Sequence, residues 1–291
     1  MQYGSLHQLH KVFYEPRPHI SRSPKGLIAT STTLSEEILD LLFSGRVSAI
    51  RIPDFYPRHL CRRMERWLYN HPDRTVYGQN AVNPHTGEIE YHDYFVDRIG
   101  EPRNRLIGKP TDAPEWQTYF RKAEQIQTEI AELTQQQHPV QQLIDLLDRI
   151  WLCGARKEQI RGRVAAAGIG RVTRPAQAKA VYPLEHPHVD GPWPCEQHFG
   201  VNVYFSMPPR GGELEAFCGP TLSAEEMQKI PFNHDFRQTH RVSELVRPHI
   251  GDLIIVNTRR PHAVTPFSHG PRVSMSCFMM FDADRPLRFY S

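Results

Sequence analysis

The feature that most restricts the fold is a series of short apolar runs in the second half of the chain. From about residue 170, stretches of strand-type composition alternate with segments that contain proline and glycine. These stretches are Ala178–Tyr182, Gly200–Ser206, Glu213–Phe217, Asp252–Val256 and Val273–Phe281. Their even spacing is typical of a β-sandwich or jelly roll, because each strand is followed by a turn that reverses the chain. We therefore predict a β core over residues 170–291.

The first half of the chain is predicted to be a helical support for this core, within one single domain. Residues 1–32 are polar and rich in proline, which indicates an irregular arm, and residues 33–169 form a helical and loop buttress. Apolar residues at helical spacing predict helices after Thr33, from Pro57, over residues 114–135 and over residues 141–152. A strand is expected over residues 47–52. Residues 71–112 are rich in Pro, Asn, Gly, Asp and Arg, which predicts a long loop with one strand near residues 91–96.

Charge and cysteine content argue against several classes of protein. The chain has 291 residues with 35 basic and 32 acidic side chains, and it contains no run of Lys and Arg, so we expect no nucleic-acid partner. No stretch reaches the roughly 18 apolar residues of a membrane span. The five cysteines include no CxxC pair, which argues against a disulfide framework or a zinc ribbon. We expect a cytoplasmic protein with a small-molecule substrate, and its oligomeric state is left open.

Two histidines and one aspartate have the spacing of a metal site. His188 and Asp190 are two residues apart, so in a strand both side chains point to the same face. His262 follows the predicted strand Gly251–Asn257 and is the best third ligand. Two imidazoles and one carboxylate occupy one face of an octahedral ferrous ion and leave the other positions free. Arg272, ten residues after His262, stands where the far end of a dicarboxylate cosubstrate needs a partner.

These motifs resemble those of the iron(II)- and 2-oxoglutarate-dependent oxygenases, in particular the prolyl-4-hydroxylase-like branch. The resemblance covers roughly residues 178–282 and rests on His188-Val189-Asp190, Gly251–Val256, Arg260–Val264 and Gly270–Ser274. It implies a mainly β fold with flanking helices, in which a double-stranded β-helix, a jelly-roll or cupin-like barrel, is supported by the N-terminal helices. Residues 218–250 are longer than the usual connection and are expected to be an insertion, either a lid or a dimer contact.

The resemblance also implies cofactors and residue roles. His188, Asp190 and His262 would bind Fe(II), Arg272 and Tyr204 would bind the distal carboxylate of 2-oxoglutarate, and Asn202 would contact the cosubstrate or substrate. The implied reaction uses O2, releases succinate and CO2, and hydroxylates an unactivated C–H bond. Ascorbate is the expected reductant in vitro. A carboxylate at position 190 favours hydroxylation over halogenation, whereas desaturation and ring closure remain open.

The substrate is expected to be a free amino acid or a similar small polar metabolite. The expected contacts are Tyr94, Arg98, Trp193, Glu196 and His198. Arg98 or Arg74 would hold a carboxylate and Glu196 an ammonium group. The alternatives are a prolyl-type hydroxylase of protein side chains, a non-catalytic cupin-like binding protein and a zinc hydrolase. A cupin-like protein would have no need of Arg272. A zinc hydrolase would need a general-base Glu placed as in an HExxH motif, and this sequence contains no such motif.

Overall fold

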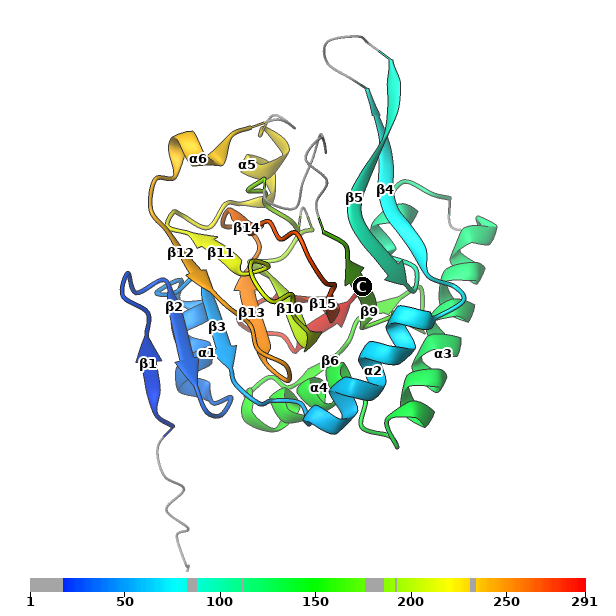
Figure 1. Ribbon diagram of the computed structural model, residues 1–291, viewed down its shortest axis with the longest axis horizontal. Coiled ribbons are helices and arrows are strands. Elements are labelled where there is room, and N and C mark those ends of the chain that lie inside the picture. Colours follow the sequence, from blue (N-terminus) through cyan, green and yellow to red (C-terminus); the bar gives the residue numbers. More distant parts are fainter. Residues whose placement is uncertain (1–17, 83–87, 111, 176–185, 192, 231–233) are drawn as a thin grey trace, which may run out of the picture.

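The computed structural model describes residues 18–82, 88–110, 112–175, 186–191, 193–230 and 234–291. The fold is mainly β, with the longer helices against a large sheet and the short helices α5 (Ala224–Gln228) and α6 (Phe236–Thr239) at the opposite end of the molecule (Figure 1). In the described part of the chain, no helix is both long and apolar enough to cross a membrane.

The major sheet runs through almost the whole chain. Its strands follow the order β1-β2-β3-β13-β10-β15-β9-β5-β4, with β16 on β15 and β6 on β16. The bounds are β1 Ile20–Arg22, β2 Ile28–Ser31, β3 Ala49–Ile52, β4 Thr75–Val82, β5 Ile89–Ile99, β6 Ala155–Lys157, β9 Ile169–Thr173, β10 Gln197–Ser206, β13 Leu253–Asn257, β15 Arg272–Phe281 and β16 Leu287–Tyr290. A separate small hairpin joins β7 Gln159–Ile160 to β8 Arg163–Val164.

A second, smaller sheet completes the barrel. It has the order β12-β11-β14, with bounds β12 Ser243–Val246, β11 Leu214–Phe217 and β14 His262–Val264. His188 adds to its edge through an isolated antiparallel bridge to His262. Apolar residues of both sheets, including Tyr204, Leu214, Val246 and Ile254, pack together in one buried cluster. Two sheets that share an interior in this way form the predicted double-stranded β-helix.

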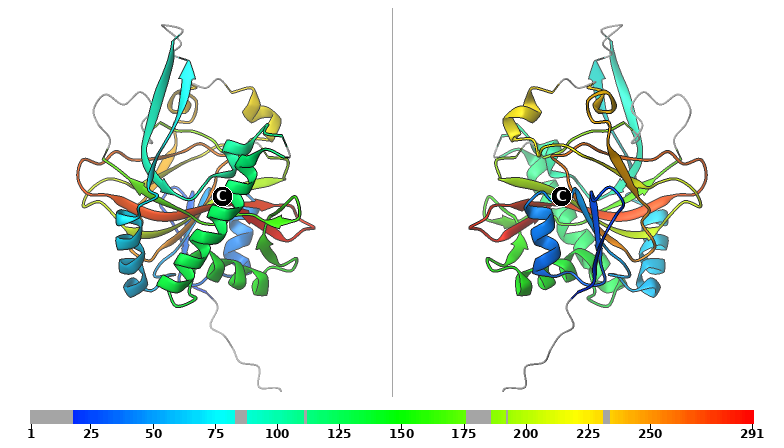
Figure 2. Two further views of the ribbon diagram at one scale, coloured as in Figure 1. Left: turned by 90° about the vertical axis from the view of Figure 1, so that its right-hand side faces the viewer. Right: turned by 90° about the vertical axis from the view of Figure 1, so that its left-hand side faces the viewer.

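The helices pack against the outer face of the major sheet. The long ones are α1 Glu36–Phe43, α2 Arg58–Asn70, α3 Pro114–Leu133 and α4 Pro139–Ile150, and a 3-10 turn, η1, spans Arg103–Leu106. Figure 2 shows these helices on one side of the strands and the hairpin of β4 and β5 projecting beyond the body of the fold. The helices predicted from apolar spacing are therefore confirmed, with ends shifted by a few residues.

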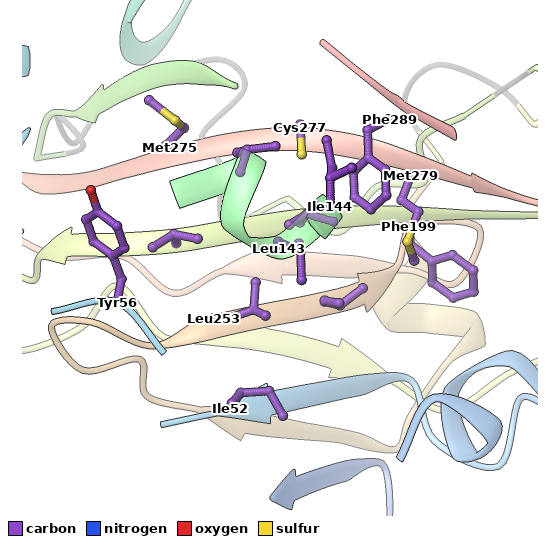
Figure 3. Packing of buried hydrophobic residues seen from close by; sticks show 14 of the residues in the cluster. Ile52, Tyr56, Leu143, Ile144, Phe199, Leu253, Met275, Cys277, Met279 and Phe289 are labelled. Atoms are coloured by element: carbon purple, nitrogen blue, oxygen red, sulfur yellow. The ribbon is translucent and has the colours of Figure 1, made fainter. Parts of the chain in front are cut away.

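Successive side chains of the central strands point alternately to the core beneath the helices and to the interior of the barrel. The apolar outward residues of β10, β13 and β15 meet the helices in the main core, where Leu143, Phe199, Leu253 and Met275 are fully or almost fully buried (Figure 3). The intervening residues of the same strands face the barrel interior, since successive side chains of a strand point to opposite faces. Truncating a buried leucine to alanine in such a core typically costs about 2–5 kcal/mol.

Three predictions about secondary structure need correction or remain untested. The irregular arm is wrong for residues 20–31, where β2 pairs in parallel with β3 and buries Ile28 and Ala29. The prediction for residues 71–112 is correct only for the strand near residues 91–96, which lies within β5, because β4 and β5 form a long antiparallel hairpin in place of the expected loop. The predicted strand Ala178–Tyr182 lies outside the described residues.

Strand β4 and the full length of β5 escaped prediction because much of the hairpin surface is exposed. Ile89 is 73% exposed and Tyr91 57% exposed, so its strands do not show the usual alternation of buried and exposed residues. The predicted boundary near residue 170 does not divide the structure either, since β3 from the first half pairs with β13 from the second. The chain forms one sheet system in which the early strands extend the barrel.

Candidate metal centre and cavity

The three predicted metal ligands lie together at one end of the barrel. The peptide groups of His188 and His262 exchange two hydrogen bonds of 3.0 Å, which places the two imidazoles side by side, with ring centroids 4.5 Å apart. The amide of Asp190 donates to the carbonyl of Thr258 at 2.8 Å. Backbone pairing between two distant segments therefore holds all three side chains in place.

Both imidazoles are oriented by hydrogen bonds to the backbone. Nδ1 of His188 lies 3.1 Å from the carbonyl oxygen of His186, and Nδ1 of His262 lies 3.1 Å from that of Arg260. A carbonyl oxygen can only accept, so each Nδ1 carries a proton, and in the neutral form of the ring Nε2 has a free lone pair. Such a bond on the far nitrogen is the usual support of a metal-bound histidine.

The spacing of the ligand atoms fits a metal ion. Oδ2 of Asp190 lies 3.7 Å from Nε2 of His188 and 3.8 Å from Nε2 of His262, and the three ligand atoms all lie within 4.8 Å of one another. These distances are too long for hydrogen bonds. Metal–ligand bonds of about 2 Å allow two ligands of one ion to lie up to about 4 Å apart. The donor set of two imidazoles and one carboxylate is that of a facial triad, and small side-chain movements would bring the three ligand atoms to the spacing of one.

The local charges keep these groups in the states that a metal requires. Burial raises the pKa of Asp190, but the neighbouring imidazoles of His188 and His262 outweigh this and lower it overall. Burial, together with the charge of His188, lowers the pKa of His262 to about 4. At neutral pH the carboxylate is therefore ionised and the His262 imidazole is neutral, which are the forms that bind a metal.

Arg272 and Tyr204 form a pair inside the barrel. Nη2 of Arg272 donates to the hydroxyl of Tyr204 at 3.0 Å, and only 6% of Arg272 is exposed. Nε of Arg272 and the hydroxyls of Ser274 and Ser276 are buried without a hydrogen-bond partner among the described residues. A carboxylate in this region would satisfy several buried donors at once. Asn202 shares this inward face through its pairing with Ser276 and is partly exposed.

A cavity of about 580 Å³ opens beside the metal ligands. His188 and Asp190 are in its wall, whereas Tyr204, Asn202 and Arg272 are not. Its other walls come from β4 and β5, from β9 and β15, and from the predicted insertion. A volume of this size is typical of a pocket for a small molecule.

The predicted substrate contacts divide into two groups. Tyr94, Trp193 and His198 line the cavity. Arg98 is not in its wall, because its guanidinium turns away to Glu101 at 2.9 Å. Glu196 is exposed and caps the amide of Ala283 at 3.3 Å, away from the cavity wall. Arg74, the second residue expected to bind a carboxylate, pairs with Asp97 at 3.4 Å.

The imidazole of His198 lines the cavity, but both of its nitrogens are already engaged by neighbouring hydroxyl groups. Its nitrogens lie 2.6 Å from the hydroxyl of Thr258 and 2.7 Å from that of Tyr290, and burial lowers its pKa to about 3. The ring packs directly on Gly191, where an added Cβ would lie 2.2 Å from Nδ1. Gly191 also has a φ of +94°, so only glycine fits after Asp190.

Two features of the site escaped the sequence analysis. Arg259 is almost fully buried and donates to the carbonyls of Gly191, Trp193, Cys195 and Glu196 at 2.6–3.2 Å. It therefore fixes the loop that follows Asp190. Arg171 on β9 also lines the cavity. Arg259 stands three residues before His262, but its contacts with the loop after Asp190 arise only in the folded chain, so no spacing rule could have assigned its role.

The insertion over residues 218–250 covers the cavity. It contains α5 Ala224–Gln228 and α6 Phe236–Thr239, as well as strand β12 of the minor sheet. Met227, Ile230 and Phe236 line the cavity. The short helix predicted near residues 224–229 is confirmed, and a capping box of Ser223 and Glu226 begins it. His186 also lines the cavity, and its Nε2 lies 3.2 Å from the carbonyl oxygen of His234, which belongs to the insertion.

Comparison with known proteins identifies the fold through structure alone. No family model matches the sequence, and no curated protein is similar to it. An N-substituted L-amino acid dioxygenase from Burkholderia ambifaria AMMD gives a TM-score of 0.55 at 15% identity, covering 90% of this chain and 93% of that one. The chain therefore has the fold of this dioxygenase.

Two further structures are more distant. The same dioxygenase in complex with alpha-KG has a TM-score of 0.48 at 14% identity, covering 88% of this chain and 90% of that one. A prolyl-4-hydroxylase from Pseudomonas putida has a TM-score of 0.37 at 14% identity, covering 82% and 95%. The assignment of the fold rests on the first structure.

Proposed function

We propose that the protein is a non-haem Fe(II)- and 2-oxoglutarate-dependent dioxygenase that hydroxylates an unactivated C–H bond of a small metabolite the size of an amino acid. The observation that carries this proposal is the convergence of His188, Asp190 and His262 beside a cavity, with two imidazole Nε2 atoms and one carboxylate directed at one point. The Arg272–Tyr204 pair within the same barrel supplies the second part of the argument.

Each residue has a role that follows from its position. His188, Asp190 and His262 would hold ferrous iron, and Arg272 with Tyr204 would bind the distal carboxylate of 2-oxoglutarate. When bound, iron, 2-oxoglutarate and O2 would together supply the oxidation of the C–H bond, with release of succinate and CO2. The barrel excludes water from the buried pair, which strengthens its attraction for a carboxylate. The insertion covers the space in which the substrate would lie.

The size of the cavity supports a small substrate over a protein side chain. A volume of about 580 Å³ holds a molecule the size of an amino-acid derivative, and α5 and α6 border it. The Burkholderia enzyme with the similar fold is a dioxygenase of N-substituted L-amino acids. Such compounds therefore belong in the first panel of substrates, beside free amino acids.

Succinate release tests the proposal. The protein would be incubated with Fe(II), 2-oxoglutarate, ascorbate and air across free and N-acetylated L-amino acids, and products would be analysed by mass spectrometry. We expect one panel member to gain one oxygen, and His262→Ala to abolish succinate formation. A matched assay with Zn(II) alone should show no turnover. A folded, iron-loaded protein that forms no succinate would contradict the proposal.

A further inference from the structure

One guanidinium in the cavity wall has no acidic partner among the described residues. Arg171 lies on β9 opposite Ser274 of β15, so it points into the barrel beside the residues that would hold the cosubstrate. Its side chain contacts the ring of Tyr77, whose centroid lies 6.0 Å away. No ion pair or hydrogen bond joins it to any residue in the described part of the chain. A charge of this kind at the wall of a cavity is well placed to attract an anion.

Neighbouring arginines are neutralised, and the contrast makes Arg171 distinctive. Arg98, which pairs with Arg171 across the strands, binds Glu101 at 2.9 Å. Arg174, three residues along the chain, binds Asp93 at 2.7 Å and Asp97 at 3.0 Å. Asp190 is the one acidic side chain among the described residues that line the cavity, and it is already a metal ligand in the proposed function.

Arg171 differs from Arg272 in its exposure to the cavity. Arg171 is partly exposed and lies in the cavity wall, whereas Arg272 is 6% exposed and does not line the cavity. Apolar and aromatic side chains, including Tyr77, Ile169 and Phe278, form much of the remaining wall, together with histidine and amide side chains. Among the described residues that line the cavity, Arg171 is the one arginine or lysine, which suits a molecule with one anionic end and an apolar body.

We propose that Arg171 binds a carboxylate of the substrate and so fixes which carbon faces the metal ligands. This inference rests on the proposed function, and it narrows the substrate to a carboxylic acid with an apolar body. A planar guanidinium matches a carboxylate with two parallel hydrogen bonds, whereas a primary amide offers only one acceptor oxygen. Arg171→Gln should therefore weaken binding of the acid roughly 10- to 100-fold, the worth of a charge-assisted hydrogen bond.

Paired acids and amides test the proposal, and none of these probes has to be the natural substrate. The probes are 4-methylpentanoate, N-acetyl-L-leucine and N-acetyl-L-phenylalanine, each compared with its primary amide. Dissociation constants would be measured by calorimetry on the Ni(II) protein with saturating 2-oxoglutarate. The variants are Arg171→Gln and Arg171→Lys, and the control is Arg156→Gln, which removes an exposed strand arginine that does not line the cavity.

The wild type and Arg156→Gln should bind at least one acid more tightly than its amide, Arg171→Gln should lose that preference, and Arg171→Lys should keep part of it. The affinity for 2-oxoglutarate should not change in Arg171→Gln. The proposal is overturned if no acid is preferred, or if the preference survives in Arg171→Gln. It is also overturned if 2-oxoglutarate binding falls instead, which would place Arg171 in the cosubstrate site.

Succinate release without added substrate, measured on Fe(II)-loaded samples of the same variants under air, distinguishes this result from failure of the proposed function. An acid preference that depends on Arg171 in a protein that forms no succinate would leave the anion site standing and contradict the oxygenase proposal. Succinate formation without an acid preference would do the reverse. Thermal unfolding of each variant shows whether it remains folded.

Discussion

Replacing Arg272 by methionine should stabilise the protein while it weakens binding of 2-oxoglutarate. Arg272 is 6% exposed, its Nε has no partner among the described residues, and its Nη2 donates to the neutral hydroxyl of Tyr204. A buried charge without a carboxylate carries a desolvation cost that the fold does not recover. Methionine keeps much of the apolar volume and removes the charge. We expect the free energy of unfolding to rise by about 1–2 kcal/mol, since apolar replacement of buried charges is often stabilising by about 1–4 kcal/mol.

The same substitution should remove most of the stabilisation that 2-oxoglutarate provides. At a concentration one hundred times Kd, a ligand that binds only the folded state adds about 2.7 kcal/mol. Loss of a charge-assisted interaction worth about 1.5–3 kcal/mol would raise Kd roughly 10- to 150-fold. The assay is urea unfolding of the Ni(II) protein with and without 2-oxoglutarate.

Arg288→Met is the contrasting control for this experiment. Arg288 is a partly buried arginine that pairs with Glu158 at 3.2 Å and Asp282 at 2.6 Å, so its replacement leaves two carboxylates without their partner. It should destabilise the protein and leave the response to 2-oxoglutarate intact. The reasoning about Arg272 fails if Arg272→Met destabilises the protein as Arg288→Met does, or if the response to 2-oxoglutarate is unchanged in it.

Three further predictions concern the metal, the loss of stability at acidic pH and the loop after the HxD motif. Asp190→Gly should remove one metal ligand and abolish hydroxylation; retained product formation by mass spectrometry would mean that this carboxylate is not needed. Burial and the charge of Lys157 lower the pKa of His138 to about 3, well below the value of about 6.5 in an unfolded chain. Below about pH 6.5 the unfolded state therefore binds a proton that the folded state excludes, so stability falls as the pH decreases toward 3. His138→Asn, which can still cap α4, should reduce the slope of the free energy of unfolding against pH by about 1.4 kcal/mol per pH unit, as measured by urea unfolding. The control His59→Asn, at an exposed position, should leave this slope unchanged. Arg259→Lys should lose most of the hydrogen bonds to the loop at residues 191–196 and lower the free energy of unfolding by about 2–3 kcal/mol; an unchanged midpoint in urea would contradict its role in holding the loop.

The barrel core was predictable because its central strands are buried against helices. Residues 200–206, 252–256 and 273–281 are apolar on the face that meets the helices, and each lies within or almost within β10, β13 or β15. Strand β4 and the extent of β5 were missed because the outer part of this hairpin is supported by pairing rather than by burial. Pairing between β5 and β9 joins residues far apart in sequence, so no local pattern reveals it.

The site also has a part that the sequence predicted and a part that it did not. The spacing of His188, Asp190 and His262 indicated a metal site, and the structure brings the three residues together. Arg98 was expected to reach the substrate because sequence shows only its charge. In the folded chain the guanidinium of Arg98 forms an ion pair with Glu101, three residues later. Arg171 was overlooked for the opposite reason, since its lack of an acidic partner among the described residues is a property of the folded neighbourhood.

Unsatisfied groups in the interior indicate where a ligand would complete the structure. Most buried polar atoms of a native protein have a partner, and exceptions tend to gather where function requires them. Nε of Arg272 and the hydroxyls of Ser274 and Ser276 lie on successive inward positions of one strand, and Arg171 pairs with Ser274 from the next strand. Local rules of folding would favour apolar residues at all four positions. A dicarboxylate and a substrate carboxylate would satisfy these donors together, which explains why a single face of β9 and β15 keeps two guanidinium groups and two hydroxyls inside a barrel.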